Sequence, residues 1–254
     1  MQNLVKWYHD GNPVGLKFHF TDDEDPLSAL FIGSEIEMET DGKVNCEKLA
    51  FKIHREFDFD FCHFEIDKSL KKDHGVEIIT QPMTLNYALN GGFQKVARVI
   101  QLAKGCGYCG NHETCGLHFH ISRTDFLVHT EDILWKLVNK FHKEFTMLSG
   151  RSNLEKMKKY ARFIPNSVNK FDQDTRYYAM NLFPLNTVEF RFPAGLGKTY
   201  EWMGFAEIFS GLVDWARKKN YSSRVLNQYD FEKLRNVIPE WGLPEAEKLL
   251  KRVR

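Results

Sequence analysis

The chain has 254 residues, of which 43% are hydrophobic and 14% aromatic, and its formal net charge is +1. A chain of this length and apolar content can bury a sizeable core in one or two domains. Because the charge is close to zero, nothing in the composition favours nucleic acid or an anionic membrane as a partner. No apolar run approaches the roughly 20 residues of a membrane-spanning helix. The N-terminal residues also lack the apolar stretch of a signal peptide, so we expect a cytoplasmic protein.

Apolar residues recur with the periods of strands and helices along the first half of the chain. A period of two predicts strands, and apolar positions three and four residues apart predict amphipathic helices. These patterns predict a hairpin of residues 14–20 and 29–39, a helix over 46–56, strands over about 60–67 and 75–80, and a helix over 85–104 that Gly91 and Gly92 weaken.

The second half of the chain continues to alternate strands with helices. The predicted elements are a strand around 117–121, a helix that begins near Thr130, a mobile polar loop over 150–176, strands over 178–183 and 187–192, a helix over 200–219 and two shorter C-terminal helices. Strands separated mostly by helices indicate an α+β fold, in which helices back the apolar face of a curved, mostly antiparallel sheet. Because the sequence has no repeat and no clear linker, we expect residues 1–254 to form a single domain.

One pattern recurs in five strand-like segments: apolar residues point to one side while Glu, Asp, His or Arg point to the other. The segments are 34–38, 64–67, 76–78, 117–121 and 188–192, and none of them contains lysine. An antiparallel sheet commonly has one solvated face, so a plain wet surface is one interpretation. Carboxylates crowded on one face repel one another unless a cation lies between them. We therefore favour a metal and phosphate site.

These polar faces supply carboxylate oxygens and imidazole, ligands that suit divalent cations. The candidate metal ligands are Glu35, Glu37, Glu77, His118 and Glu189. This set exceeds what one Mg²⁺ takes from a protein, so we expect two or more Mg²⁺ ions, which Mn²⁺ could replace, against the phosphates of ATP. Arg191 shares a face with Glu189 and could neutralise charge on a transferring phosphoryl group. His120 fits either a hydrogen-bonded core histidine or a contact to the nucleotide.

Three of the five cysteines, Cys106, Cys109 and Cys115, lie close together in sequence around His112. A Cys-x-x-Cys pair followed by a third cysteine and flanked by histidine could form a small zinc knuckle. A second Cys-x-x-Cys pair is missing, and the glycines of this segment suit a turn that leads into the next strand. Both interpretations stay open.

Six short segments resemble the amidoligase family, and they occur in the order seen in that family. They are Gly33–Glu37, Asp67–Leu70, Gly75–Ile78, Cys115–His120, Arg176–Tyr177 with Asn181–Leu182, and Thr187–Arg191. The family belongs to the carboxylate–amine ligases built on the glutamine synthetase and glutamate–cysteine ligase fold. The resemblance spans about residues 30–197 and leaves the helices of 199–254 outside it.

The resemblance implies an ATP-dependent, Mg²⁺-requiring enzyme that phosphorylates a carboxylate and lets an amine displace the phosphate. By motif position, the metal ligands would be Glu35, Glu37, Glu77, His118 and Glu189. It also implies that His120 lies by the nucleotide, that Arg191 steadies the phosphoryl group, and that Asp67 and Arg176 face the substrates. The sequence departs from the family at Lys68, where a glycine is common, and in the cysteine-rich stretch before His118.

Two other functions compete with an amidoligase. A small-molecule kinase would use the same fold and the same metals but would release a stable phosphorylated product. A zinc-binding adaptor would depend on Cys106, Cys109 and Cys115 instead of the acidic face. The sequence leaves the identity of the carboxylate and amine, either small molecules or peptides, and the oligomeric state open.

Overall fold

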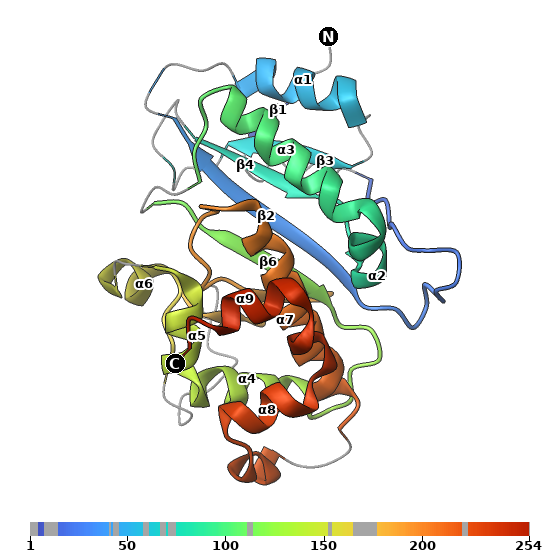
Figure 1. The fold of residues 1–254 in the computed structure, drawn as a ribbon, viewed down its shortest axis with the longest axis vertical. Helices are drawn as coiled ribbons and strands as arrows, with labels where there is room; N and C mark the ends of the chain where they lie inside the picture. The colour runs from blue at the N-terminus through green and yellow to red at the C-terminus, as the bar shows by residue number, and fades with distance from the viewer. Residues whose placement is uncertain are drawn as a thin grey trace.

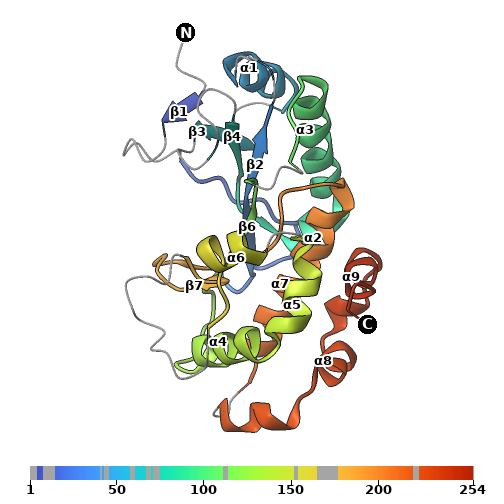
Figure 2. The same cartoon turned by 90° about the vertical axis from the view of Figure 1, so that its left-hand side faces the viewer.

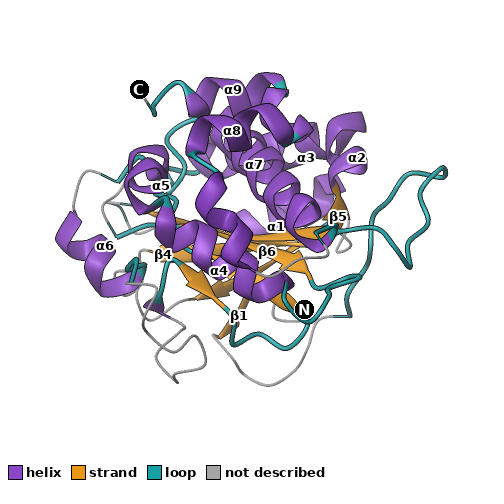
Figure 3. Cartoon of the chain, turned by 90° about the horizontal axis from the view of Figure 1, so that it is seen from below, coloured by secondary structure: helices purple, strands orange, loops and turns teal. Residues whose placement is uncertain are grey.

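The computed structural model describes residues 5–7, 15–40, 42, 46–57, 61–66, 70, 75–110, 114–151, 154–164, 177–219 and 223–253. Its centre is a sheet of eight strands with helices packed on one face (Figure 3). The strands follow the order β1 (Val5–Trp7), β3 (Cys62–Ile66), β4 (Gly75–Thr80), β2 (Phe31–Glu39), β6 (Leu117–Ser122), β8 (Thr187–Phe190) and β7 (Met180–Asn181), with β5 (Met83–Thr84) also paired to β2. All the strand pairs are antiparallel except β1 with β3.

Strand β2 runs through the middle of the sheet (Figure 1) and separates two chemically different faces. Ile32, Ile36 and Met38 are fully buried against the helices. Ser34 lies on the same face, where its Oγ accepts a hydrogen bond of 2.8 Å from Trp202 Nε1. Because strand side chains alternate, the glutamates between these residues point to the opposite, open side.

The α-helices are α1 (Cys46–Phe57), α2 (Leu85–Tyr87), α3 (Phe93–Gly105), α4 (Thr130–Lys140), α5 (His142–Ser149), α6 (Leu154–Tyr160), α7 (Thr199–Arg217), α8 (Phe231–Val237) and α9 (Pro244–Leu250). Between some of them lie the short π-helix η1 (Ala88–Gly92) and the short 3₁₀ helices η3 (Ser223–Gln228) and η4 (Pro239–Gly242). Figure 2 shows most of them, including α1, α3, α7 and α9, stacked along one side of the sheet.

Helix α7 is the main support of the strands that carry the histidines. The ring of Phe209 stacks on Phe190 of β8 with centroids 4.3 Å apart and meets Phe119 of β6 at 5.5 Å. Aromatic pairs of this kind stabilise a core beyond the area that they bury. They fix β6 and β8 side by side, so the polar residues next to Phe119 and Phe190 in sequence share the other face.

Several sequence predictions are confirmed. The helix predicted over 46–56 is α1, the strands predicted near 60–67 and 75–80 are β3 and β4, and the helix predicted over 200–219 is α7. The glycine pair does interrupt the helix predicted over 85–104, because Gly91 has a φ of +121°, a conformation that favours glycine.

Two predictions about local structure are wrong, and one strand is missing from the predictions. Residues 29–39 form β2, which pairs with β4, β5 and β6, while residues 15–20 contribute only a bridge between His19 and Met83, so the predicted hairpin does not exist. The nine-residue strand β2 forms its backbone hydrogen bonds with β4 on one edge and β6 on the other. Both of these strands are long enough to pair with most of its length, unlike the short segment before it. The region 150–176, predicted as a loop, contains helix α6, and residues 165–176 lie outside the described part. Strand β1 was not predicted at all.

Within the described residues, we find no helix with the length and apolar character needed to cross a lipid bilayer.

A buried carboxyl group joins α7 to the C-terminal helix α9. Glu207 Oε2 accepts a hydrogen bond of 2.5 Å from the backbone N–H of Ala246, and burial raises the pKa of Glu207 from 4.5 to about 7. The folded chain therefore holds this proton more tightly than the unfolded chain does. The resulting contribution to stability is complete below the unfolded pKa and is lost as the pH rises to about 7.

We expect Glu207→Gln to remove this loss, because glutamine keeps an acceptor oxygen for Ala246 without the charge. The free energy of unfolding should rise at pH 8 by up to about 3 kcal/mol and change little at pH 4.5. Urea unfolding at the two pH values measures the difference, with the exposed Glu247→Gln as control. A gain of the same size at both pH values would contradict the assignment.

Candidate metal and phosphate site

The open face of the sheet brings together polar side chains from four strands. The pairing places Glu35 opposite His118, Glu37 opposite Glu77, and His120 opposite Glu189. Directly paired residues have their Cβ atoms only about 5 Å apart. Residues separated by more than 150 positions in sequence therefore lie in one patch.

Glu35 is the centre of this patch. Its Oε2 lies 3.0 Å from His118 Nδ1 and its Oε1 lies 2.9 Å from His120 Nε2. Burial by itself would raise the pKa of Glu35, but His120 and His118 hold that pKa well below its usual range. Burial would likewise lower the pKa of His120, but the Glu35 carboxylate outweighs it and raises the pKa to about 9. The Glu35 carboxylate and the His120 imidazolium thus stabilise each other in their charged forms.

Glu189 is held from three sides and is only 3% exposed. Its Oε1 lies 3.7 Å from His118 Nδ1 and 4.0 Å from His120 Nε2. Asn181 Nδ2 donates to Glu189 Oε2 at 2.7 Å, and Arg191 donates to Oε1. These contacts fix the carboxylate toward the histidines.

A row of three carboxylates crosses the sheet beside this centre. Glu37 is paired to Glu77, and Glu77 is paired in turn to Glu65 of β3. Glu37 and Glu77 are 5% and 3% exposed. Like charges directly opposite one another destabilise a sheet, so this row favours a bound cation. Glu65 shows the same alternation as the other segments, but the sequence analysis did not place it among the metal ligands.

Two groups of side chains have the spacing of a cation site. Glu35, Glu77 and His118 form one, and Glu35, His120 and Glu189 form the other, each with its ligand atoms within 4.8 Å of one another. Four of the five predicted metal ligands belong to these groups, which share Glu35. The fifth, Glu37, has its Oε1 3.8 Å from His118 Nε2. His120, predicted to contact the nucleotide, lies among the ligand groups instead of apart from them.

Two further features of the site fit phosphate and metal. Arg191 Nε is buried and has no hydrogen-bond partner among the described residues, so it offers one N–H to an acceptor that the protein does not supply. At Gly116, a Cβ atom would lie 2.8 Å from His118 Nε2 and 3.2 Å from Glu37 Oε2. The backbone N–H of Gly116 donates to Glu37 Oε2 at 2.5 Å. The absent side chain of Gly116 leaves room for these groups to converge.

Arg151 supports the site through the segment that follows β8. The sequence patterns do not single it out as a site residue, because there it only begins a polar, basic stretch. Its Nε donates to the carbonyl oxygen of Phe192 at 3.0 Å and its Nη2 to that of Pro193 at 2.9 Å. The guanidinium also lies 3.1 Å from where a Cβ of Gly116 would be. Arg151 thus fixes the chain where it leaves β8, just after Arg191, and adds positive charge near Glu37. Burial lowers the pKa of Arg151, and the Glu37 carboxylate offsets part of that change.

We expect Arg151→Lys to lower the free energy of unfolding by about 2 kcal/mol, because a lysine cannot donate to both carbonyl groups from one planar fork. Its affinity for Mn²⁺ should fall as well, since the strand end that carries Arg191 is no longer fixed. Urea unfolding and a Mn²⁺ titration measure both effects against the exposed Arg98→Lys. Unchanged values for both would show that Arg151 has no positioning role.

The structure does not describe the remaining predicted site residues. Asp67 and Arg176, predicted to face the substrates, lie outside the described part of the chain. No group of three metal-binding side chains in the described residues contains a cysteine, and His112 is not described.

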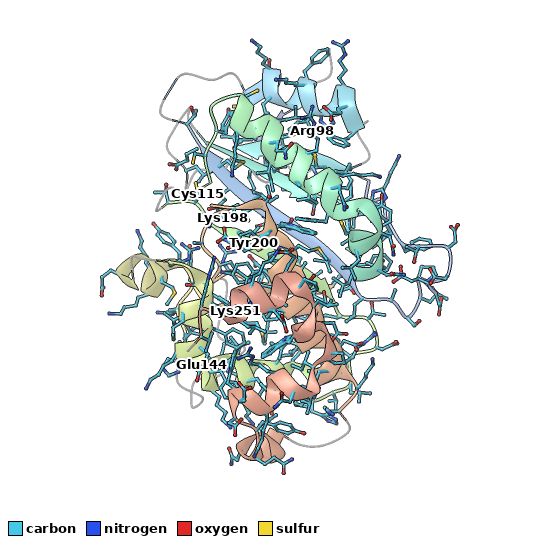
Figure 4. The ribbon with its side chains drawn as sticks, viewed as in Figure 1. Arg98, Cys115, Glu144, Lys198, Tyr200 and Lys251 are labelled. Carbon is cyan, nitrogen blue, oxygen red and sulfur yellow. The ribbon has the colours of Figure 1, made fainter. Side chains whose placement is uncertain are left out.

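The described residues 106–110 of the cysteine-rich segment form a turn that pairs with the end of β2. The backbone N–H of Cys109 donates to Glu39 O, and Glu39 N–H donates to Cys109 O at 2.9 Å. Figure 4 labels Cys115 at the start of β6, and the N–H of Gly195 donates to Cys115 O. Burial raises the pKa of the Cys115 thiol, with further contributions from Glu39 and Glu37. The neutral form of the thiol suits this packed position.

Comparison with known proteins gives a fold but no close relative. No protein-family model and no curated protein matches the chain. Among solved structures, a GmaS/ADP complex has a TM-score of 0.51 at 12% sequence identity, covering 88% of this chain and 64% of that chain. Glutamine synthetase of Plasmodium falciparum has a TM-score of 0.50 at 12% identity, covering 76% of this chain and 52% of that chain.

The chain therefore spans between about half and two-thirds of the length of these proteins. At such low identity the likeness bears on the fold, and the narrower assignment to amidoligases rests on the sequence motifs. The element order, the mostly antiparallel sheet and the helical layer together give this chain the α+β fold of the glutamine synthetase catalytic domain.

Proposed function

We propose that the chain is an ATP-dependent carboxylate–amine ligase, an amidoligase, that joins a small-molecule or peptide carboxylate to an amine. The observation that carries this proposal is the convergence of two adjacent cation-binding groups and Arg191 on the open face of a glutamine synthetase-like sheet. We treat residues 1–254 as one catalytic domain, because one hydrophobic core includes residues from every strand between β2 and β8. Neither nucleic acid nor a membrane is part of the proposed reaction.

The residues fit the metals and nucleotide that this reaction requires. Two Mg²⁺ or Mn²⁺ ions would be held by Glu35, Glu77 and His118 on one side and by Glu35, His120 and Glu189 on the other. When bound, ATP supplies the phosphoryl group that turns the carboxylate into an acyl phosphate, and the cations neutralise its phosphate charge.

Arg191 has the clearest role among the residues that are not ligands. One of its N–H groups donates to Glu189, and the buried Nε–H is left for an acceptor. A guanidinium fixed in this way stabilises negative charge as it develops on a transferring phosphoryl group. By motif position alone, Asp67 and Arg176 orient the carboxylate and the amine.

The burial of these side chains suits the step in which the amine attacks the acyl phosphate. Glu37, Glu77, His118 and Glu189 are each no more than 6% exposed. Limited access of water to this face protects an acyl phosphate from hydrolysis until the amine attacks. Holding both substrates beside the phosphate also replaces an encounter between two molecules by a step within one complex.

The test is an assay of phosphate release from ATP with Mg²⁺ and a panel of carboxylates and amines. We expect release only when an acid and an amine are both present, with an amide of the summed mass less water in the mass spectrum. A stable phosphorylated product without an amide would identify a kinase of the same fold. Release that needs neither substrate, or none across a broad panel, would contradict the ligase.

A further inference from the structure

Five large apolar side chains are exposed at one end of the sheet, in loops that adjoin β2, β6 and β8. The segment before β2 carries one of them, the segment after β6 carries two, and the turn between β7 and β8 carries two: Leu27, Leu127, Val128, Phe183 and Leu185. Each is at least 42% exposed, and Val128 is 95% exposed. We call these five residues the apolar patch.

Hydrogen bonds hold the three loops of the patch side by side. Arg217 Nη1 donates to the carbonyl oxygens of Ser28 at 2.9 Å and of Thr124 at 3.4 Å, which ties the first loop to the second. Arg123 Nη2 donates to the carbonyl oxygen of Leu182 at 2.7 Å, which ties the second loop to the third. The exposed apolar residues therefore belong to one surface, and such a surface commonly marks a contact with another macromolecule.

The loops that carry the patch are acidic. Residues 21–29 contain four carboxylates and no lysine or arginine. Asp125, in the second loop, is 64% exposed although its Oδ2 lies 3.7 Å from Arg217. Arg123 is bound to Glu131 and to backbone carbonyl groups. The patch thus fits a partner with positive charge around an apolar centre, whereas an anionic membrane or a second copy of the same patch would bring like charges together.

Helices α1 and α3, which lie side by side in Figure 1, have the complementary charge. Together they carry six lysine and arginine residues and two glutamates, all of them exposed. Residues three and four apart share one side of a helix, so exposed cations of α1 surround Phe51, which is 58% exposed. Arg98 of α3 joins this surface through its ion pair with Glu56 of α1. We call the surface the basic face and define it by Lys48, Phe51, Lys52, Arg55 and Arg98.

We propose that the apolar patch of one copy of this chain binds the basic face of a second copy. Phe51 packs against the leucines of the patch, and Lys52 and Arg55 lay their apolar stems on it while their charged ends reach the surrounding carboxylates. Because the two surfaces are different, the contact is head-to-tail and leaves each pair of copies with one patch and one basic face for further copies. Neither surface includes a residue of the proposed cation-binding groups, so the contact is independent of the proposed ligase reaction.

Sedimentation velocity of the full chain over a series of protein concentrations measures this association. We expect the mean mass to rise with concentration beyond the mass of a dimer. It should fall when the salt concentration is raised, because salt screens pairs of exposed charges. A chain that stays monomeric at every concentration, or that associates more strongly in high salt, would overturn the proposal.

Two pairs of substitutions at exposed positions then separate the two surfaces. Lys52→Glu with Arg55→Glu reverses the charge of the basic face, and Val128→Lys with Leu185→Lys replaces the centre of the patch by positive charge. We expect each variant alone to associate about tenfold more weakly than the unaltered chain. Association that survives in the first variant and is lost in the second would show that the patch binds another patch, and would overturn the head-to-tail contact.

An equal mixture of the two variants gives the sharpest result. The first variant keeps an intact patch and the second keeps an intact basic face, so we expect a dimer of one copy of each and no larger species. Formation of this dimer also shows that both variants are folded. Absence of the dimer would contradict the proposal if circular dichroism shows both variants folded. Lys158→Glu with Lys159→Glu on α6, which makes the same charge change at exposed positions, is the control and should associate as the unaltered chain does.

Discussion

Replacing Glu189 by glutamine is expected to lower turnover by about a hundredfold or more, because the variant loses a proposed metal ligand. Glu189 belongs to one of the two proposed cation-binding groups and is also the partner of Arg191. Glutamine keeps the volume and can still hydrogen-bond Asn181, but it removes the negative charge. Of the two proposed cations, the one among Glu35, His120 and Glu189 should therefore be lost first.

The same variant should remain folded. Glutamine fills the same buried space, and its side-chain oxygen can still accept from Asn181 or Arg191. Turnover, Mn²⁺ affinity and thermal unfolding are measured together, with the exposed Glu155→Gln as the matched control. Retained turnover with weakened Mn²⁺ binding would show that the reaction does not use this cation, and a collapse of the fold would show a structural role instead.

Replacing Arg191 by lysine is expected to lower kcat by roughly a hundredfold to a thousandfold while changing the affinity for ATP much less. Lysine keeps the positive charge but cannot donate to Glu189 and to a phosphoryl oxygen from one fixed plane. The loss of rate should therefore appear in phosphoryl transfer, the step in which negative charge develops on the transferring group.

Steady-state kinetics with varied ATP separate these two effects, and Arg98→Lys, in an exposed ion pair with Glu56, serves as the control. A rise in KM for ATP with kcat unchanged would assign Arg191 to nucleotide binding only. A Mn²⁺ affinity that falls as far as in Glu189→Gln would mean that Arg191 acts by orienting that carboxylate.

The faces of the individual strands could be predicted from the sequence because alternation is a local property. Glu35, His118 and Glu189 each stand between apolar residues, so their direction relative to the core follows from the period of two. The fold class follows from the same patterns. That these three residues meet is a matter of strand order, which depends on pairing between distant segments.

Strand pairing explains the main errors. The nine-residue strand β2 was paired with the nearest segment in sequence, whereas its partners are β4 and β6. Short edge strands such as β1 carry too few residues for a periodic signal.

The supporting residues could not be predicted because they act through geometry. Arg151 binds carbonyl groups across the fold, and Gly116 matters for the side chain that it lacks. Neither role leaves a pattern in sequence. Glu65 is different, because its segment shows the same alternation of apolar and acidic residues as the segments that carry the predicted ligands. The sequence pattern is therefore sufficient to predict Glu65 as a candidate ligand.

The most direct test of the central claim is a crystal structure with Mn²⁺ and a non-hydrolysable ATP analogue, in which anomalous scattering locates the metals. We predict two peaks on the open face of the sheet, one among Glu35, Glu77 and His118 and one among Glu35, His120 and Glu189, with the analogue's terminal phosphate near Arg191. Peaks only at the cysteine-rich turn, or a nucleotide bound elsewhere with the acidic face empty, would contradict it.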